Sequence, residues 1–358
     1  MGLLEETLEA ITSPDAAAAA EASRRLDSLT KPRGSLGHLE EIVRRYAAVR
    51  RDASAGFGGG ALCVFVADHG VAAEGVSAYP QAVTAEMLRN IAGGGAAISV
   101  LARRLGYRLW ITDVGVAADT SAAALPGVVY RRVGAGTCNL SREAAMSAGE
   151  ARAALEVGIE VARAAVAAGA TLLGIGEMGI ANSTSAAALL AAFTRIRPAR
   201  LAGRGAGLDA AAMPHKVATI ERALKLHRAK LKDPMATLAA LGGFEIAAMA
   251  GVCLGGAALN VPVMVDGFIA TAAAVAAERL SPGLFAHLFF GHRSSEGGHA
   301  LGLAKLGVRP IVDLEMRLGE GTGAALAMSL VEAALALFHE MATFESAGVS
   351  EKVAGKAE

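Results

Sequence analysis

The sequence predicts an α/β protein with a parallel sheet flanked by helices, together with a small helical bundle built from both ends of the chain. Hydrophobic residues make up 53% of the 358 residues and charged residues 19%. Much of that apolar excess is alanine, which favours helices. Continuous apolar runs such as 61–67 resemble strands that are buried on both faces, as in a parallel sheet.

The first 50 residues are expected to be helical. Ser13, Pro14 and Asp15 predict a helix start, and a further helix should run from about 35 to 49, after a break at 31–34. Short helices seldom form a core alone, so the helix expected from about 323 to 343 is their available partner. We therefore predict a small helical domain of residues 1–55 with 325–358, and a large α/β domain of residues 56–324.

The middle of the chain alternates strands and helices. Strands are expected at 61–67, 108–114, 170–175 and 261–265, with another at 128–133 and a long helix over 141–168. Such repeats imply right-handed crossovers and a parallel sheet. Because Asp68, Asp113 and Asp266 stand at or directly after the carboxyl ends of strands, we expect a binding site where the strands end.

Composition limits the possible partners. The 34 basic and 34 acidic residues give a formal net charge of zero, and aromatic residues are only 4%, so no nucleic-acid partner is expected. Three separated cysteines fit a reducing cytoplasm. The acidic N-terminus is unlike a secretory signal, and the uncharged run 246–265 contains glycines and a proline. We expect this run to be a buried helix and a short strand, with no membrane partner.

A glutamate enclosed by glycines is the strongest candidate for chemistry. Gly319, Glu320 and Gly321 precede a helix that starts near Thr322. Glycines permit positive φ and close backbone approach, and a helix N-terminus favours anions. Because Thr322 could cap the helix by itself, the glutamate points to function.

Two further glycine-rich turns could contact a ligand. Residues 174–185 contain G-x-G-x-x-G and Glu177, but the acidic residue expected about 20 positions later for a dinucleotide is missing. The turn at 203–208 leads to Lys216, which is either a phosphate counter-charge or solvated surface. Both turns could present backbone N–H groups to phosphate, and we expect Glu320 to lie beside the first.

Other catalytic patterns are missing from the sequence. It lacks a G-x-S-x-G elbow, an H-E-x-x-H helix and a Walker A motif. His69, His292 and His299 stand singly among glycines, so they are expected to be hydrogen-bonded loop residues and no metal site is predicted. The catalytic arrangement that remains possible is a carboxylate acting as a base beside loops that bind phosphate.

Several long motifs resemble one enzyme family. The chain is similar, in motif order and over nearly its whole length, to the nicotinate-nucleotide:dimethylbenzimidazole phosphoribosyltransferase family of cobalamin lower-ligand assembly. The motifs are Leu29–Gly37, Ala67–Val71, Gly174–Ser185, Gly242–Ile246, Asp266–Ile269 and Arg317–Ala325. Two places depart from the usual pattern: Ala206 replaces a threonine, and Glu143 begins a segment that is usually G-P-A-M.

The resemblance implies transfer of phosphoribose from nicotinate mononucleotide to dimethylbenzimidazole, without a cofactor. By this resemblance Glu320 is the general base, flanked by Gly319 and Gly321, and burial should raise its pKa. The other implied substrate-binding residues are Glu177, Gly176, Met178, Gly179, Lys216, Asp266, Gly267, Ser77, Tyr79 and Gln81.

The same resemblance implies a Rossmann-like sheet and a homodimer.

Two alternative functions remain open from the residues alone. The weak G-x-G-x-x-G pattern would fit a nucleotide-binding oxidoreductase, and the pocket would also fit a non-catalytic carrier of an azole or a nucleotide.

Overall fold

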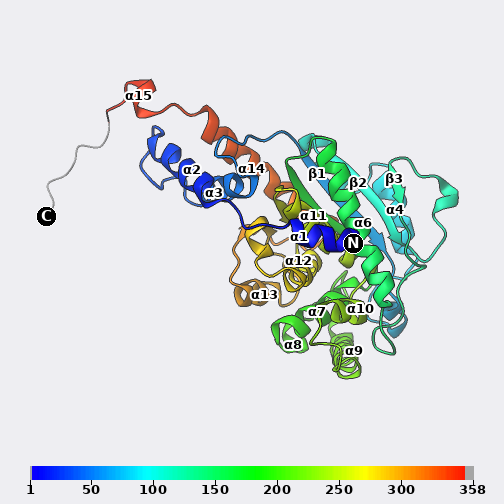
Figure 1. Ribbon diagram of the computed structural model, residues 1–358. Helices are drawn as coiled ribbons and strands as arrows, with labels where there is room; N and C mark the ends of the chain where they lie inside the picture. Colours follow the sequence, from blue (N-terminus) through cyan, green and yellow to red (C-terminus); the bar gives the residue numbers. More distant parts are fainter. Residues whose placement is uncertain (1, 351–358) are drawn as a thin grey trace.

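The computed structural model describes residues 2–350, and its centre is a seven-stranded parallel sheet (Figure 1). The strand order is β3-β2-β1-β4-β5-β6-β7. The strands are β1 (Gly60–Ala67), β2 (Arg108–Gly115), β3 (Val128–Tyr130), β4 (Leu172–Met178), β5 (Val263–Val265), β6 (Leu288–His292) and β7 (Pro310–Val312). The predicted α/β fold with a parallel sheet is confirmed.

Strand β1 shows why the sheet is buried on both faces. Alternate residues of a strand point to opposite sides. Cys63 and Phe65 join the core beneath α6 (Ala148–Ala167), α11 (Phe244–Ala258) and α12 (Phe268–Leu280). Val64 and Val66 join the core on the other face, beneath α3 (His38–Arg50), α4 (Val83–Ala92), α5 (Ala97–Leu105) and α14 (Thr322–Glu340). The protein therefore has three layers, helix, sheet and helix.

Helices α6 and α11 pack closely because glycines face each other. A Cβ atom on Gly158 would overlap the carbonyl oxygen of Ala248, and a Cβ atom on Gly251 would overlap that of Leu155. Helix α11 is the predicted buried helix of the uncharged run, and it ends at Ala258 as expected. Its apolar surface is covered by protein on several sides, including α6 and α12.

The terminal helices meet where α14 passes α3. Asp15 caps α2 (Ala16–Ser28) by accepting hydrogen bonds from the N–H groups of Ala17 and Ala18. Figure 1 shows α2 and α3 beside α14, and Leu29 forms a β-bridge with Thr343. By contrast, α1 (Leu3–Ala10) packs on α6 and α11. The division into two domains stays a prediction, and its residues 351–358 lie outside the described part.

Six further α-helices complete the part of the chain that the structure describes. They are α7 (Asn182–Thr194), α8 (Pro198–Leu201), α9 (Met213–Leu226), α10 (Pro234–Leu241), α13 (His299–Leu306) and α15 (Phe344–Ala347). Short 3₁₀ segments are η1 (Gly70–Glu74), η2 (Ser121–Ala123), η3 (Ala210–Ala212) and η4 (Leu284–His287). Figure 1 shows α7, α8, α9 and α10 grouped together at one end of the molecule.

Two element boundaries and two unpredicted strands are the main differences from the predictions. The helix expected from 141 begins at Ala148, because Ser147 and Glu150 form a capping box there. The strand expected over 128–133 has only three residues. Strands β6 and β7 were not predicted as strands, since they are short and 291–299 is rich in glycine and polar residues.

Helix α14 is long and apolar enough, by length and composition, to cross a membrane. More than half of its most apolar stretch is buried in the protein. It packs against β4, β5, β6 and α3, as the core helix of a folded domain does.

Candidate active site

A cavity of about 890 Å³, its open mouth included, lies over the carboxyl ends of β4, β5 and β6. Its wall comes from the β4–α7 turn, the β5–α12 turn, the loop after β6, residues 204–206, residues 76–77, and the loop before α14. The strand order reverses between β1 and β4, and crevices beside such a reversal are usual binding sites in open α/β sheets. The predicted site at the strand ends is therefore present as a cavity.

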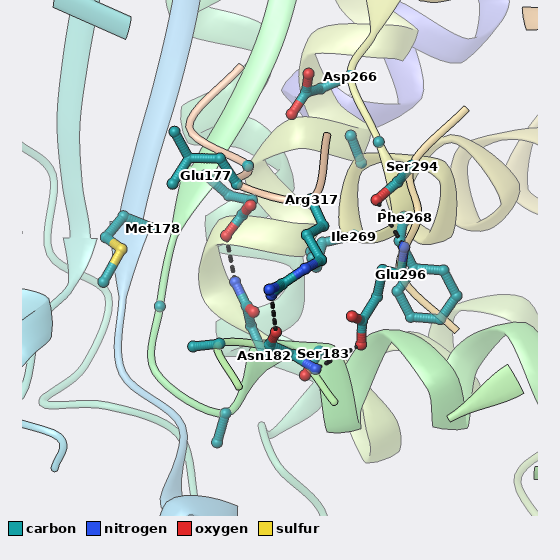
Figure 2. Close-up of a pocket in the computed structure, with 18 of the residues that line it drawn as sticks. Glu177, Met178, Asn182, Ser183, Asp266, Phe268, Ile269, Ser294, Glu296 and Arg317 are labelled. Carbon is teal, nitrogen blue, oxygen red and sulfur yellow. Dashed lines mark hydrogen bonds between the residues drawn. The ribbon is translucent and has the colours of Figure 1, made fainter. Parts of the chain in front are cut away.

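Glu177, Asp266 and Glu296 are buried acidic residues in the wall of this cavity, and burial perturbs the pKa values of the first two. Glu177, at the end of β4, accepts a hydrogen bond from the Asn182 side chain, as Figure 2 shows. Burial, and then the nearby Glu245, raise the pKa of Glu177 to about 8. Asp266, after β5, has its pKa raised to about 7 by burial, although hydrogen bonds from the N–H groups of α14 oppose the rise. Glu177 can therefore carry a proton at neutral pH.

Asp266 also holds the start of α14. Its Oδ1 accepts a hydrogen bond from the Ala324 N–H at 2.8 Å, and its Oδ2 accepts one from the Gly321 N–H at 3.3 Å. Gly321, the N-cap residue of α14, has no side chain for this purpose. Asp266 thus caps the helix from a neighbouring strand end and fixes the loop that carries Glu320.

The loop that carries Glu320 has an unusual backbone. Gly319, Glu320 and Gly321 have φ values of 90°, 62° and 90°. The left-handed conformation costs a non-glycine residue roughly 1–2 kcal/mol, and such strain clusters at functional sites. The N–H of Glu320 donates to the carbonyl oxygen of Glu177 at 3.2 Å. The expected closeness of Glu320 to the 174–185 turn is confirmed.

The Glu320 side chain points toward the N-terminus of α5. Its Oε2 accepts a hydrogen bond from the Ile98 N–H at 3.2 Å, and the residue is buried. Burial raises the pKa of Glu320, whereas the N–H groups of Ile98 and Ala97 oppose that rise. The predicted direction of the shift is confirmed. Gly319 lines the described cavity, while the carboxylate of Glu320 lies behind it, against α5.

Lys216 is fully buried, so the surface interpretation of this residue is wrong. Its Nζ donates to Ser183 Oγ at 2.8 Å and to the Gly203 carbonyl oxygen at 2.9 Å. Burial lowers the pKa of Lys216 to about 8, against the opposing effect of Glu296. Because an ammonium has three N–H donors, contacts within residues 2–350 leave one for a ligand.

Of the three residues predicted to flank the ring, only Ser77 lines this cavity. Ser77 lines the cavity beside Val76. The Tyr79 side chain is 52% exposed, and Gln81 is partly buried; neither belongs to the wall of this cavity as residues 2–350 define it. The N–H of Tyr79 donates to Ser77 Oγ at 3.3 Å, which forms a tight turn there.

The other predicted positions lie at or beneath the cavity wall. Met178, Gly179 and Gly267 line it. Gly176 lies within β4, and a Cβ atom there would be 2.5 Å from the Glu320 carbonyl oxygen and the Gly321 nitrogen. Gly174 is also inside β4, so the G-x-G-x-x-G pattern does not form the turn that a dinucleotide fingerprint requires.

The structure adds polar residues that were not singled out. They are Asn182, Ser183, Ser294, Glu296 and Arg317, all labelled in Figure 2. Glu296 Oε1 accepts a hydrogen bond from the Gly205 N–H at 2.7 Å, and Arg317 reaches the Gly205 carbonyl oxygen at 3.5 Å. Each of these residues lies in a glycine-rich segment of the sequence, and that glycine content was the one feature that could have marked them as site residues.

Two strand-end acids have a structural role instead. Asp68 Oδ2 accepts a hydrogen bond from the Ala117 N–H at 2.8 Å. Asp113 Oδ1 accepts from Gly115 and Val116 at 3.0 and 2.9 Å. Both carboxylates organise the loop after β2, so the expectation that they share the site with Asp266 is wrong.

His69 and His299 are hydrogen-bonded, as expected, but Nε2 of His292 is buried without a hydrogen-bond partner within residues 2–350. His292 ends β6 and His299 begins α13, so the expectation that they are loop residues is wrong. His69 Nε2 lies 2.6 Å from Glu245 Oε1, and both residues are buried. His299 Nδ1 accepts a hydrogen bond from the Ser294 N–H at 2.9 Å, and its Nε2 lies 3.0 Å from Thr271 Oγ1. His299 thereby supports the loop that places Ser294 and Glu296 in the cavity wall.

Comparison with known proteins decides the family. A family model described as phosphoribosyltransferase matches residues 11–349. The chain belongs to this phosphoribosyltransferase family. Its motif resemblance is therefore confirmed over almost the full described length.

The relatives of this family member are similar over their whole length. A protein named nicotinate-nucleotide–dimethylbenzimidazole phosphoribosyltransferase from Chloroflexus aggregans is 49% identical, over 98% of this chain and 99% of the relative. One of the same name from Chlorobium chlorochromatii is 48% identical over the same shares. The crystal structure of CobT from Thermus thermophilus has a TM-score of 0.89 and 45% identity, covering 94% of this chain and 100% of that chain.

Proposed function

We propose that this chain transfers the phosphoribosyl group of nicotinate mononucleotide to dimethylbenzimidazole, releasing nicotinate and α-ribazole phosphate. The observation that carries the proposal is the 49% identity, over nearly all of both chains, to a relative named for this reaction. The cavity agrees with it, because the buried carboxyl groups of Glu177 and Asp266 lie at one part of its wall and the ammonium of Lys216, near Glu296, lies behind another. An enzyme is therefore favoured over a carrier.

In the proposed reaction a ring nitrogen of dimethylbenzimidazole attacks the anomeric carbon of the nucleotide. The bond from that carbon to the pyridinium nitrogen breaks, and the nitrogen keeps the electron pair, so nicotinate leaves without a positive charge on its ring. Attack from the opposite face inverts the configuration from β to α. The other ring nitrogen of the acceptor loses its proton, which requires a base.

Glu320 is the proposed base. Its pKa is raised by burial, which makes the carboxylate a better proton acceptor than an exposed glutamate. The bond from the Ile98 N–H favours the ionised carboxylate, against the larger effect of burial, and orients it before the acceptor binds. Gly319 and Gly321 carry no side chains that would obstruct a flat ring beside it.

The nucleotide is proposed to bind along the other wall. Lys216 and the N-terminus of α7 would attract its phosphate, since both are electropositive. Met178, Gly179 and Gly267 line the intervening surface and would contact the nucleotide, with Gly176 beneath them. Protonated Glu177 could donate a hydrogen bond to the nucleotide or its leaving base.

Ser77, Tyr79 and Gln81 are proposed to flank the acceptor ring. Ser77 already lies in the cavity wall, and Tyr79 follows it in an exposed turn. We also propose that the protein works in the cytoplasm as a homodimer. Its substrates are small molecules, so neither nucleic acid nor membrane is required.

The test is turnover. Purified protein is incubated with nicotinate mononucleotide, with and without dimethylbenzimidazole, and nicotinate and the new nucleoside phosphate are separated chromatographically. We expect equal amounts of both products only when the azole is present. Failure to release nicotinate with any of several azoles would contradict the proposal, and tight binding of a nicotinamide dinucleotide would favour an oxidoreductase.

A further inference from the structure

Glu74 is the meeting point of three segments outside the cavity wall. It ends η1, two residues before Val76 in the wall. Its Oε2 accepts a hydrogen bond from Arg222 Nη2 at 2.6 Å, and its Oε1 accepts bonds from Asn139 Nδ2 at 2.7 Å and Arg142 Nε at 2.8 Å. The Glu74 side chain is only 9% exposed. This arrangement differs from an isolated surface ion pair, because several donors converge on one nearly buried carboxylate.

The backbone of Glu74 is held by the same helix. Nε2 of His215 donates to the Glu74 carbonyl oxygen at 2.7 Å. His215 and Arg222 both belong to α9, and His215 immediately precedes Lys216. Helix α9 carries Lys216, the residue proposed to bind phosphate. It is therefore joined by two hydrogen bonds to Glu74, which lies shortly before the proposed ring-binding residues Ser77–Gln81.

The third segment, residues 139–143, forms hydrogen bonds both to Glu74 at the end of η1 and to Arg222 of α9. Arg222 Nη2 also donates to Ser141 Oγ at 2.9 Å, and His227, which follows α9, bonds to the Leu140 carbonyl oxygen at 2.9 Å. Burial of Glu74 opposes its ionisation, but its bonds to Arg142, Asn139 and Arg222 outweigh that effect and lower its pKa. At neutral pH the junction therefore contains a carboxylate between two guanidinium groups.

We propose that Glu74 is a positioning residue for the transfer reaction, which fixes the distance between the Val76–Ser77 end of the cavity and the α9 helix that carries Lys216. This inference rests on the proposed function for its catalytic consequence. Attack on the anomeric carbon needs the two substrates at a defined separation, and errors of about 1 Å can cost a hundredfold in rate. Each substrate alone needs only its own end of the cavity.

Glu74→Gln is the primary variant, because it retains the size of the side chain and one acceptor oxygen but removes its charge. We expect kcat to fall at least about tenfold, while the Kd of nicotinate mononucleotide, measured alone by calorimetry, stays within about twofold. Glu86→Gln is the matched control: Glu86 is exposed on α4 and has no side-chain hydrogen bond or ion pair within residues 2–350. Its kcat should equal that of the wild type.

A double-mutant cycle with Arg222→Gln tests whether both residues act as one unit. The double variant should be no slower than the slower single variant, since the same link is already lost. A kcat of Glu74→Gln equal to that of the control would overturn the proposal. A parallel loss of thermal stability and of nucleotide binding would also overturn it, by showing a general structural role.

Hydrogen exchange of the unliganded protein provides a readout that does not depend on turnover. In Glu74→Gln, amides in 76–81 and in the first turn of α9 should exchange faster, while those of the sheet should not change. Unchanged exchange in both segments would defeat the link even if the protein had another activity. If the wild-type protein showed no turnover, the proposed function would be refuted instead.

Discussion

Replacing Gly176 by alanine tests how closely β4 supports the loop of Glu320. The added Cβ would lie 2.5 Å from both the Glu320 carbonyl oxygen and the Gly321 nitrogen. Both atoms are backbone, and the loop is held in place by Asp266 and by the carbonyl oxygen of Glu177. Ordinary contact requires about 3.4 Å, so the loop must move away from β4 by about 0.9 Å.

A displacement of that size at a catalytic base should lower kcat/KM about a hundredfold, which corresponds to roughly 2.7 kcal/mol. Overpacking should also reduce the free energy of unfolding by about 1–3 kcal/mol. Nicotinate release and urea unfolding measure the two effects. Gly302→Ala is the control, because no heavy atom of residues 2–350, beyond its sequence neighbours and its own helix backbone, would lie within 4 Å of its added Cβ. A folded Gly176→Ala enzyme with activity within twofold of the wild type would refute the reasoning.

Two more predictions concern buried ionisable groups. Lys216→Met should raise the KM for nicotinate mononucleotide at least about tenfold, and in the wild type that KM should rise as the pH passes about 8, because the ammonium then loses its charge. Initial rates across pH 6 to 9 would show both, and a flat profile would contradict them. For Glu177 the folded pKa of about 8 exceeds the usual glutamate value of 4.5, so the folded state binds the proton more tightly. The free energy of unfolding should then fall from about pH 5 to pH 8, by at most about 1.4 kcal/mol per pH unit. In urea titrations Glu177→Gln should show a smaller fall over this range. An equal dependence on pH in the wild type and in Glu177→Gln would show that Glu177 does not cause it.

Strand 61–67 could be predicted because every residue in it is apolar, a pattern that requires burial on both faces. The closeness of Glu320 to the 174–185 turn was expected from a single site at the strand ends together with the family resemblance, and the Glu320–Glu177 backbone bond confirms it. In contrast, Lys216 could not be placed from sequence, since burial depends on Ser183 and Gly203 in other segments. The role of Asp113 was missed for a similar reason: a carboxylate near the end of a strand can bind its own loop instead of a ligand.

The short strands at the edge of the sheet carried too little signal. β6 ends at His292, and β7 has only three residues, so neither shows a periodicity of its own. Arg317 and Asn182 were visible within noted motifs, but only the folded chain shows that they face one cavity (Figure 2).

The pH dependence of kcat/KM in the wild type and in Glu320→Gln tests the central claim most directly. Burial raises the pKa of Glu320, so the wild-type rate should fall on the acid side at a pH above the usual glutamate value of 4.5. Glu320→Gln should lose that acid limb and be about 10²–10⁴-fold slower on the plateau, with nucleotide binding retained. An unchanged acid limb in a variant of nearly wild-type rate would show that another group accepts the proton.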